Sequence, residues 1–194
     1  MVRLLLQSKK PDQVYSVVTP EHGYSERIAD ILRDLGVPTS YGSDTGMPLY
    51  REATDLLSIG VDIYGREQRL VRDAAIRWHA MHAAARQEDV TLLPISGFRS
   101  VDYQLEIWHR KLTSGESVHQ ILRVSAPPGY SEHHSGRAVD ITTLGCPPVT
   151  EEFESTLAFA WLLAHAKEFG FSMTYPRNNR FGIVYEPWHW ATRV

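Results

Sequence analysis

Two short polar stretches that lie far apart in the sequence constrain this chain more than any other feature. Residues 131–140 read SEHHSGRAVD, and residues 186–189 read EPWH, close to the last residue. Together they offer two imidazoles, from His133 and His189, and one carboxylate, from Asp140. This is the ligand count of a catalytic zinc site that keeps one position open. A fold that uses these side chains as one site must bring the two stretches together.

A fourth residue, Glu186, is a carboxylate three positions before His189 that the ligand set does not need. Zinc hydrolysis requires a general base that moves a proton, and Glu186 can serve as that base. The same residue types also occur by chance. The alternative interpretation is a histidine in a turn, an aspartate that caps and a histidine in the core. Spacing alone does not decide between the two interpretations.

Composition places the chain among globular proteins and excludes several classes of function. The chain is 43% hydrophobic and 22% charged, which is ordinary for a globular protein. Its formal net charge is -3 and it has no basic stripe, so we expect no nucleic-acid partner. Cys146 is the single cysteine, which excludes an intramolecular disulfide and a cysteine-rich zinc site.

Hydropathy sets the expectation for membranes and export. No stretch approaches the roughly 18 apolar residues of a membrane span. The apolar run at residues 4–6 is shorter than the roughly 7 to 15 residues of a signal-peptide core. We therefore expect a cytoplasmic protein or, if a leader has been removed, one that acts in the periplasm or at the cell wall.

We predict that residues 1–45 form an N-terminal extension and that residues 46–194 form the main domain. Gly and Pro residues between the two indicate a connecting loop. The elements expected in the extension are a strand at 14–18, a turn at 19–23, a helix that Ser25 caps and that ends at Gly36, and a loop at 39–48.

The clearest pattern in the main domain is the recurrence of apolar residues at every third and fourth position of residues 66–87, which predicts a long helix. His79 and His82 lie on it, and we expect a structural role for both because no acidic third ligand is near. The other predicted elements are a short helix at 49–59, strands at 91–96 and 138–142, a helix after Ser100, a segment at 113–129 that is loop-like at both ends, a helix that Thr150 caps, and strands at 171–175 and 181–185.

Four blocks of this sequence resemble the VanY-type zinc D-alanyl-D-alanine carboxypeptidases. They are residues 96–100 with Gln104, residues 131–140, residues 161–171 and residues 186–190. The blocks occur in the family's order, and the resemblance covers roughly residues 65 to 194. It implies an α+β fold of the hedgehog/D,D-peptidase type: a small mixed or antiparallel sheet with helices on one side and a zinc cleft on its open face.

The resemblance also implies roles for the four residues introduced first. His133, Asp140 and His189 would bind zinc, and Glu186 would be the general base. The family's Ser-x-His pattern selects His133 as the ligand, which leaves His134 as a pocket residue, a neighbour of the ligands or an exposed side chain.

A polar wall around the substrate is implied as well. Arg99 resembles the family arginine that holds the substrate's carboxylate or its reacting carbonyl oxygen, and a guanidinium can bind a carboxylate through two hydrogen bonds. Ser96, Gln104 and Ser131 would complete this wall, although each could instead be a cap or turn residue. Trp188 and Tyr175 would line the cleft.

The expected function is therefore a zinc carboxypeptidase that removes a C-terminal D-alanine from a peptidoglycan stem peptide or muropeptide. It is either a D,D-enzyme on pentapeptides or an L,D-enzyme on tetrapeptides, and work on cytoplasmic muropeptides would slightly favour the second. One alternative is a lysin-type endopeptidase that cuts the wall. Another is a non-catalytic zinc-bearing binding module, because the hedgehog signalling domain shares the general fold. The sequence does not determine the oligomeric state.

Overall fold

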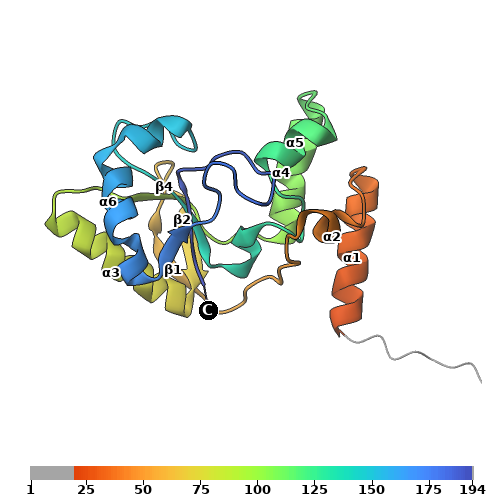
Figure 1. The fold of residues 1–194 in the computed structure, drawn as a ribbon. Helices are drawn as coiled ribbons and strands as arrows, with labels where there is room; N and C mark the ends of the chain where they lie inside the picture. Colours follow the sequence, from red (N-terminus) through yellow and green to blue (C-terminus); the bar gives the residue numbers. More distant parts are fainter. Residues whose placement is uncertain (1–19, 194) are drawn as a thin grey trace, which may run out of the picture.

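A computed structural model describes residues 20–193 of the chain, with side chains from residue 23 onward. Its centre is a four-stranded antiparallel sheet in the order β3-β4-β6-β5 (Figure 1). A separate antiparallel hairpin of β1 and β2 lies beside it. The strands are β1 (Leu56–Val61), β2 (Glu67–Val71), β3 (Leu93–Ser96), β4 (Ala138–Thr142), β5 (Phe171–Met173) and β6 (His189–Thr192).

The first hydrophobic core joins the sheet to α3 (Arg72–Gln87) and α6 (Leu157–His165). The small alanine side chains on the buried face of α3 let this helix pack closely against the rest of the first core, as the alanines in its sequence predict. Trp78 is buried on the same face. Burying an aromatic or aliphatic side chain contributes about 1.5–3 kcal/mol, so this core holds the sheet firmly. Its largest fully buried members are Trp78, Phe153, Phe171, Leu70, Met81, Leu92, Ile141 and Leu162.

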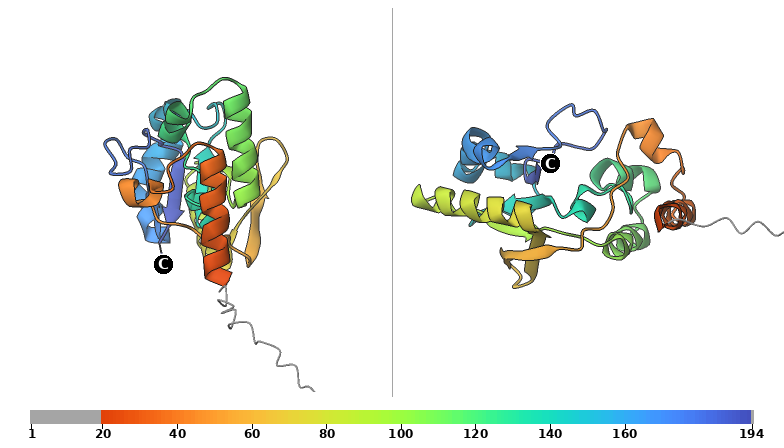
Figure 2. Two further views of the ribbon diagram at one scale, coloured as in Figure 1. Left: turned by 90° about the vertical axis from the view of Figure 1, so that its right-hand side faces the viewer. Right: turned by 90° about the horizontal axis from the view of Figure 1, so that it is seen from below.

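A second core lies on the other side of the molecule (Figure 1). It joins α1 (Pro20–Asp34), α2 (Tyr41–Thr45), α4 (Val101–Thr113) and α5 (Val118–Val124). Figure 2 shows α1 and α4 side by side, and Arg27 on α1 pairs with Asp102 on α4 at 2.6 Å. The second core also includes Tyr175 and Ile183, which belong to the chain between β5 and β6.

Gly129 shows how closely α1 approaches the rest of the chain. Its φ is +89°, and a Cβ at this position would lie 2.6 Å from the side chain of Ile28 on α1. Only glycine meets both demands without strain. The backbone of Gly129 also accepts a hydrogen bond from Tyr50 N–H at 2.8 Å. The N-terminal helix thus packs directly against the segment that leads into residues 131–140.

Several predicted elements are confirmed. Strand β3 matches the prediction at 91–96, β4 matches the one at 138–142, and α4 follows Ser100, whose hydroxyl accepts a hydrogen bond from Tyr103 N–H. The predicted α+β class is also found, and the strand pairs are all antiparallel within the described residues. The strand predicted at 14–18 lies outside these residues.

Other predictions are wrong where long-range pairing outweighs local pattern. The long helix begins at Arg72 rather than at 66, because residues 67–71 pair with β1 as a hairpin, with Leu57 opposite Leu70. For the same reason the helix predicted at 49–59 is absent, and part of this segment forms β1. Residues 181–185 form no strand, and the last strand begins only at His189.

The remaining corrections concern helix ends. Helix α1 begins at Pro20 within the predicted turn, and proline suits a first helical position. The loop predicted at 39–48 contains α2. The segment 113–129, predicted to be loop-like at both ends, contains α5 between those ends, and Ser117 and Gln120 begin this helix with a capping box. Thr150 makes no cap hydrogen bond, and the cap of α6 is Thr156, whose hydroxyl accepts the N–H of Phe159. Short 3₁₀ helices complete the fold at Glu132–Ser135 (η1), Glu151–Ser155 (η2) and Ala166–Phe169 (η3).

Among the described helices, none has the length and apolar character needed to cross a membrane.

Candidate metal centre

Strand register brings the two polar stretches together. Asp140 on β4 lies directly opposite His189, the first residue of β6. On its other side Asp140 lies opposite Ser96, the last residue of β3. His133 comes from η1, which ends at Gly136 just before β4. One central strand with its two neighbours therefore positions most of the site.

Gly136 makes the tight connection between η1 and β4. Its φ is +65°, in the left-handed region that favours glycine. A Cβ here would lie 3.0 Å from the side chains of Ala53 and Val71. The turn that presents His133 is thereby pressed against the β1–β2 hairpin, so the hairpin fixes its position.

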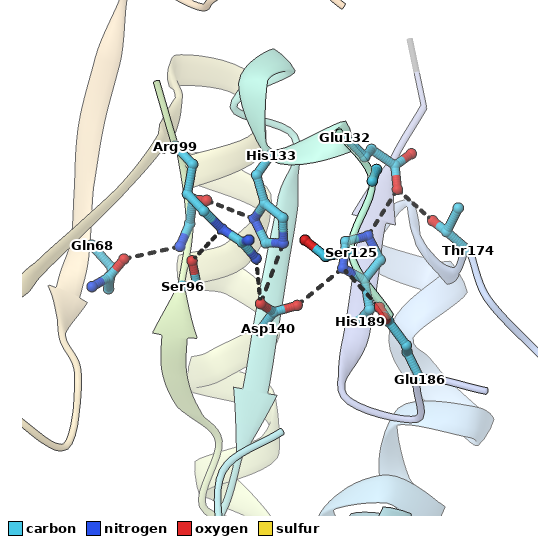
Figure 3. Close-up of polar contacts among 12 residues, drawn as sticks. Gln68, Ser96, Arg99, Ser125, Glu132, His133, Asp140, Thr174, Glu186 and His189 are labelled. Carbon is cyan, nitrogen blue, oxygen red and sulfur yellow. Dashed lines mark hydrogen bonds and ion pairs between the residues drawn. The ribbon is translucent and has the colours of Figure 1, made fainter. Parts of the chain in front are cut away.

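His133, Asp140 and His189 converge in three dimensions, as the sequence predicted (Figure 3). One ligand atom from each lies within 4.8 Å of the others, and the three residues are buried. Asp140 Oδ1 is 3.0 Å from His189 Nδ1, and Asp140 Oδ2 is 3.3 Å from His133 Nε2. Two imidazole nitrogens and a carboxylate oxygen are ligand types that zinc accepts.

The protonation of His133 supports a cation at this point. Its Nδ1 lies 2.7 Å from the carbonyl oxygen of Gly97, so Nδ1 must donate. Burial, together with the nearby Arg99, lowers the pKa of His133 to about 4, which leaves the ring neutral at pH 7. The other nitrogen, Nε2, then carries a lone pair, and it is buried without a hydrogen-bond partner. A lone pair facing the Asp140 carboxylate is suited to a metal ion.

His189 lies between two carboxylates. Its Nδ1 faces Asp140, and its Nε2 is 2.9 Å from Oε2 of Glu132. Burial acts to lower the pKa of His189, but hydrogen bonds to Asp140 and Glu132 raise it to about 10. The ring therefore holds a positive charge between the two acids unless a metal ion takes the place of the Nδ1 proton.

Glu186 is placed beside the ligands but not among them. Its Oε2 is 3.8 Å from His189 Nδ1, and its backbone N–H donates to the carbonyl of Tyr175 at 3.0 Å. Burial raises the pKa of this carboxyl to about 7. A carboxyl with such a pKa can both accept and return a proton near neutral pH.

Arg99 lies on the opposite side of Asp140. Its Nη2 donates to Asp140 Oδ2 at 2.8 Å, its Nε donates to Ser96 Oγ at 2.9 Å and its Nη1 donates to Gln104 Oε1 at 3.2 Å. Gln104 is in turn held by Ser125 Oγ, to which its Nε2 donates at 3.0 Å. The predicted neighbours of Arg99 thus fix the guanidinium beside the ligand set.

A cleft of about 350 Å³ opens onto these residues. Its walls come from α4, from the segment after α5, from η1 and from the chain between β5 and β6. Of the predicted wall residues, Gln104, Ser131, Tyr175 and Trp188 line this cleft. Ser96 instead faces an adjoining hollow, where its hydroxyl holds Arg99. Tyr175 and Ile183 of the second core line this cleft, as does Trp188, which packs against the first core.

His134 has a structural position. It is fully buried, and its Nδ1 donates to the carbonyl oxygen of Arg99 at 2.7 Å. Its Nε2 accepts the N–H of Gly129 at 3.0 Å. Both ring nitrogens are used by backbone groups, so His134 ties the Arg99 loop to the turn before η1 and does not join the ligands.

Sequence reasoning missed the acceptors that surround the ligands. Glu132 contacts His189 and also accepts a hydrogen bond from Thr174 Oγ1 at 2.7 Å. Gln68 on β2 accepts the N–H of Gly97, whose carbonyl faces His133 (Figure 3). The signal for Glu132 was chemical: a ligand imidazole commonly donates its other N–H to a carboxylate, and Glu132 is the acidic residue directly before the candidate ligand His133. Gln68 carries no comparable signal.

Comparison with known proteins places this arrangement in a family. A sequence model of the VanY family, described as D-alanyl-D-alanine carboxypeptidase, matches residues 67–192. The chain belongs to the VanY family. The match includes Glu132, all three candidate ligands and Glu186, and it leaves α1 and α2 outside.

Relatives of known sequence or structure agree with the VanY assignment. The chain is 30% identical to YodJ of Bacillus subtilis (strain 168) over 93% of its own length, and it spans 63% of YodJ. The LD-carboxypeptidase LdcB is 32% identical, with a TM-score of 0.65 over 75% of this chain and 71% of LdcB. A mutant of the D,D-pentapeptidase VanY from a VanB-type resistance cassette, solved with Zn(II), is 26% identical, with a TM-score of 0.58 over 75% of this chain and 82% of that one.

Proposed function

We propose that this protein is a zinc-dependent carboxypeptidase that removes a C-terminal D-alanine from peptidoglycan peptides. The observation that carries the proposal is the convergence of His133, Asp140 and His189, with Glu186 beside them and an open cleft in front. Membership of the VanY family and the likeness to a VanY structure with Zn(II) and to the LD-carboxypeptidase LdcB support the proposal.

The residues present fit zinc. His133 would offer Nε2, His189 would offer Nδ1 and Asp140 would offer a carboxylate oxygen. When bound in such a site, zinc lowers the pKa of water from about 15.7 to about 7 and polarises a carbonyl oxygen.

The protein's own side chains would carry the remaining steps. Glu186 takes a proton from the attacking water and delivers it to the amine of the departing D-alanine, which keeps the proton count balanced. Arg99 is held at the edge of the cleft, where its guanidinium can stabilise the substrate's carboxylate or its developing oxyanion. Gln104 and Ser131 supply polar groups to the same wall.

The substrate is either a tetrapeptide or a pentapeptide stem. The likeness to LdcB, which has the higher identity and TM-score of the two structures compared, favours the tetrapeptide and thus an L,D-carboxypeptidase. A cytoplasmic location and the division into residues 1–45 and 46–194 stay predictions.

A direct test incubates the zinc-loaded protein with defined tetrapeptide and pentapeptide stems and identifies the products by mass spectrometry. We expect release of one D-alanine, loss of this release after chelation, and recovery when zinc is added back. Absence of D-alanine release from both peptides would refute the proposal. Soluble fragments released from purified sacculi would indicate the endopeptidase alternative.

The variant Glu186→Gln tests the base. Removing a general base lowers rates by about 10²–10⁴-fold, while zinc content should stay the same because Glu186 is not a ligand. The matched control is Glu168→Gln, an exposed glutamate paired with His165 at 3.1 Å outside the cleft, which should retain full activity. A Glu186→Gln protein that releases D-alanine at the wild-type rate would refute the role of Glu186 as general base, whereas a wild type that binds zinc but releases no D-alanine would favour the binding-module alternative.

A further inference from the structure

Glu132 holds the nitrogen of His189 that faces away from Asp140 (Figure 3). The distance between His189 Nε2 and Glu132 Oε2 is 2.9 Å. The same carboxylate oxygen accepts the hydroxyl of Thr174 at 2.7 Å. The Glu132 side chain is only 14% exposed. A largely buried carboxylate that accepts two hydrogen bonds at one oxygen is fixed in place.

The chemistry of imidazole gives this contact a consequence. A neutral ring has one N–H and one lone pair. When a metal ion takes the place of the Nδ1 proton, the carboxylate at Nε2 keeps the remaining proton there, so the lone pair on Nδ1, the atom that lies 3.0 Å from Asp140, is available to the metal. Acceptors of this kind fix the tautomer and orientation of ligand histidines.

We propose that Glu132 is the positioning residue for His189: it selects the Nδ1 ligand atom and sets the angle of the ring, and Thr174 keeps Glu132 in place. This inference rests on the proposed zinc site. Glu132 is not itself placed as a ligand, because it contacts the nitrogen on the far side of the ring from Asp140.

The fold explains why this contact couples the ligands to one another. Glu132 and His133 are neighbours in η1, so one turn provides a ligand and the group that orients a second ligand. Thr174 follows β5, which pairs with β6, the strand that begins at His189. The oxygen of Glu132 therefore joins η1 to the far edge of the sheet across the ligand ring.

The test measures zinc affinity of the full chain by competition with a chromophoric chelator. Loss of a group that orients a ligand costs about 10–100-fold in metal affinity, and we expect this loss for Glu132→Met, which removes the acceptor at similar length. Glu132→Gln keeps an acceptor oxygen and should lose less. The control Glu168→Gln removes the charge from another histidine–glutamate pair and should bind zinc like the wild type.

A spectroscopic measurement separates orientation from general stability. In the zinc-loaded wild type, ¹⁵N NMR of the histidine rings should show the His189 proton on Nε2. In Glu132→Met this proton should exchange faster with solvent. If Glu132→Met does not fold, Thr174→Val decides the question, because it retains the carboxylate and removes only its hydrogen bond, and it should weaken zinc binding severalfold.

The outcomes distinguish the two proposals. A folded wild type that binds no zinc refutes the proposed function, and the positioning role falls with it. Zinc binding by Glu132→Met, or by the substitute Thr174→Val, within twofold of the wild type refutes the positioning role alone. A proton found on His189 Nδ1 in the zinc-loaded wild type does the same.

Discussion

Replacing Gln68 with leucine should destabilise the fold and weaken the zinc site, although Gln68 touches none of the three ligands. Its Oε1 accepts the N–H of Gly97 at 2.9 Å, and its Nε2 donates to Asp62 Oδ2 at 3.1 Å. The carbonyl of Gly97 is the acceptor for Nδ1 of His133. A chain of hydrogen bonds thus runs from the β1–β2 hairpin to a ligand.

The magnitude follows from the groups left unpaired. Leucine has nearly the size of glutamine but cannot accept the N–H of Gly97, which is buried. A buried donor without a partner costs about 1–3 kcal/mol. Asp62 loses one donor but keeps those of Tyr64 and Arg66, so its share is smaller. We expect a total of about 2–3 kcal/mol, which lowers Tm by roughly 4–12 °C in a domain of this size.

The assay is thermal and urea unfolding of the metal-free protein, followed by chelator competition for zinc. Gln68→Leu should bind zinc about threefold to tenfold more weakly, because Gly97 is no longer fixed beneath His133. The control Gln87→Leu makes the same exchange at an exposed position at the end of α3 and should stay within about 0.5 kcal/mol of the wild type.

A second substitution at position 68 tests whether a negative charge beside Asp62 makes stability depend on pH. Gln68→Glu keeps an acceptor for Gly97 but puts a second carboxylate beside Asp62. Repulsion raises the pKa of this pair in the folded state above its unfolded value, so stability should improve as the pH falls from 7 toward 5. Unchanged stability of Gln68→Leu, or a Gln68→Glu variant without this pH response, would contradict the proposed chain of hydrogen bonds.

Two further predictions concern stability. Leu32→Ala should lower the free energy of unfolding, measured in urea, by about 2–5 kcal/mol, because Leu32 is 1% exposed in the second core. The control Leu157→Ala changes a side chain that is 83% exposed and should lower it little. Equal effects of the two substitutions would contradict the role of α1 in that core. Burial opposes the charge of Asp62, but hydrogen bonds from Arg66 lower its pKa below 3.8, so the charged form stabilises the fold above the unfolded pKa and this contribution is lost as the pH falls. Asp62→Asn should therefore cost about 1–3 kcal/mol at pH 7 and less below about pH 4, and a pH-independent difference would refute the assignment.

Local sequence patterns predicted the elements whose cause is local. Ser100 caps α4 through a hydrogen bond within one turn, and the apolar run at β3 is buried as expected. Local patterns predicted the wrong element where a segment pairs with another that is distant in the sequence. Residues 67–71 carry a helical periodicity, but pairing with β1 buries Leu70 completely, and that burial outweighs a weak helical preference.

For the candidate site, too, some features could be predicted from the sequence and others could not. Residue types suggested His133, Asp140, His189 and Glu186, the resemblance to the VanY-type carboxypeptidases selected them, and the structure brings these four together. The placement of His134 could not be predicted, since its role depends on backbone groups of segments remote from it in sequence.

The sequence by itself determined which chemical groups this protein has: two imidazoles and a carboxylate that can bind a metal, a further carboxyl that can carry a proton and a guanidinium that can pair with an anion. Only the tertiary structure decided which nitrogen of each imidazole faces Asp140. That choice depends on Gly97 and Glu132, which hold the other nitrogens. Such contacts follow from strand register and from the packing of two cores, and both depend on interactions between residues far apart along the chain.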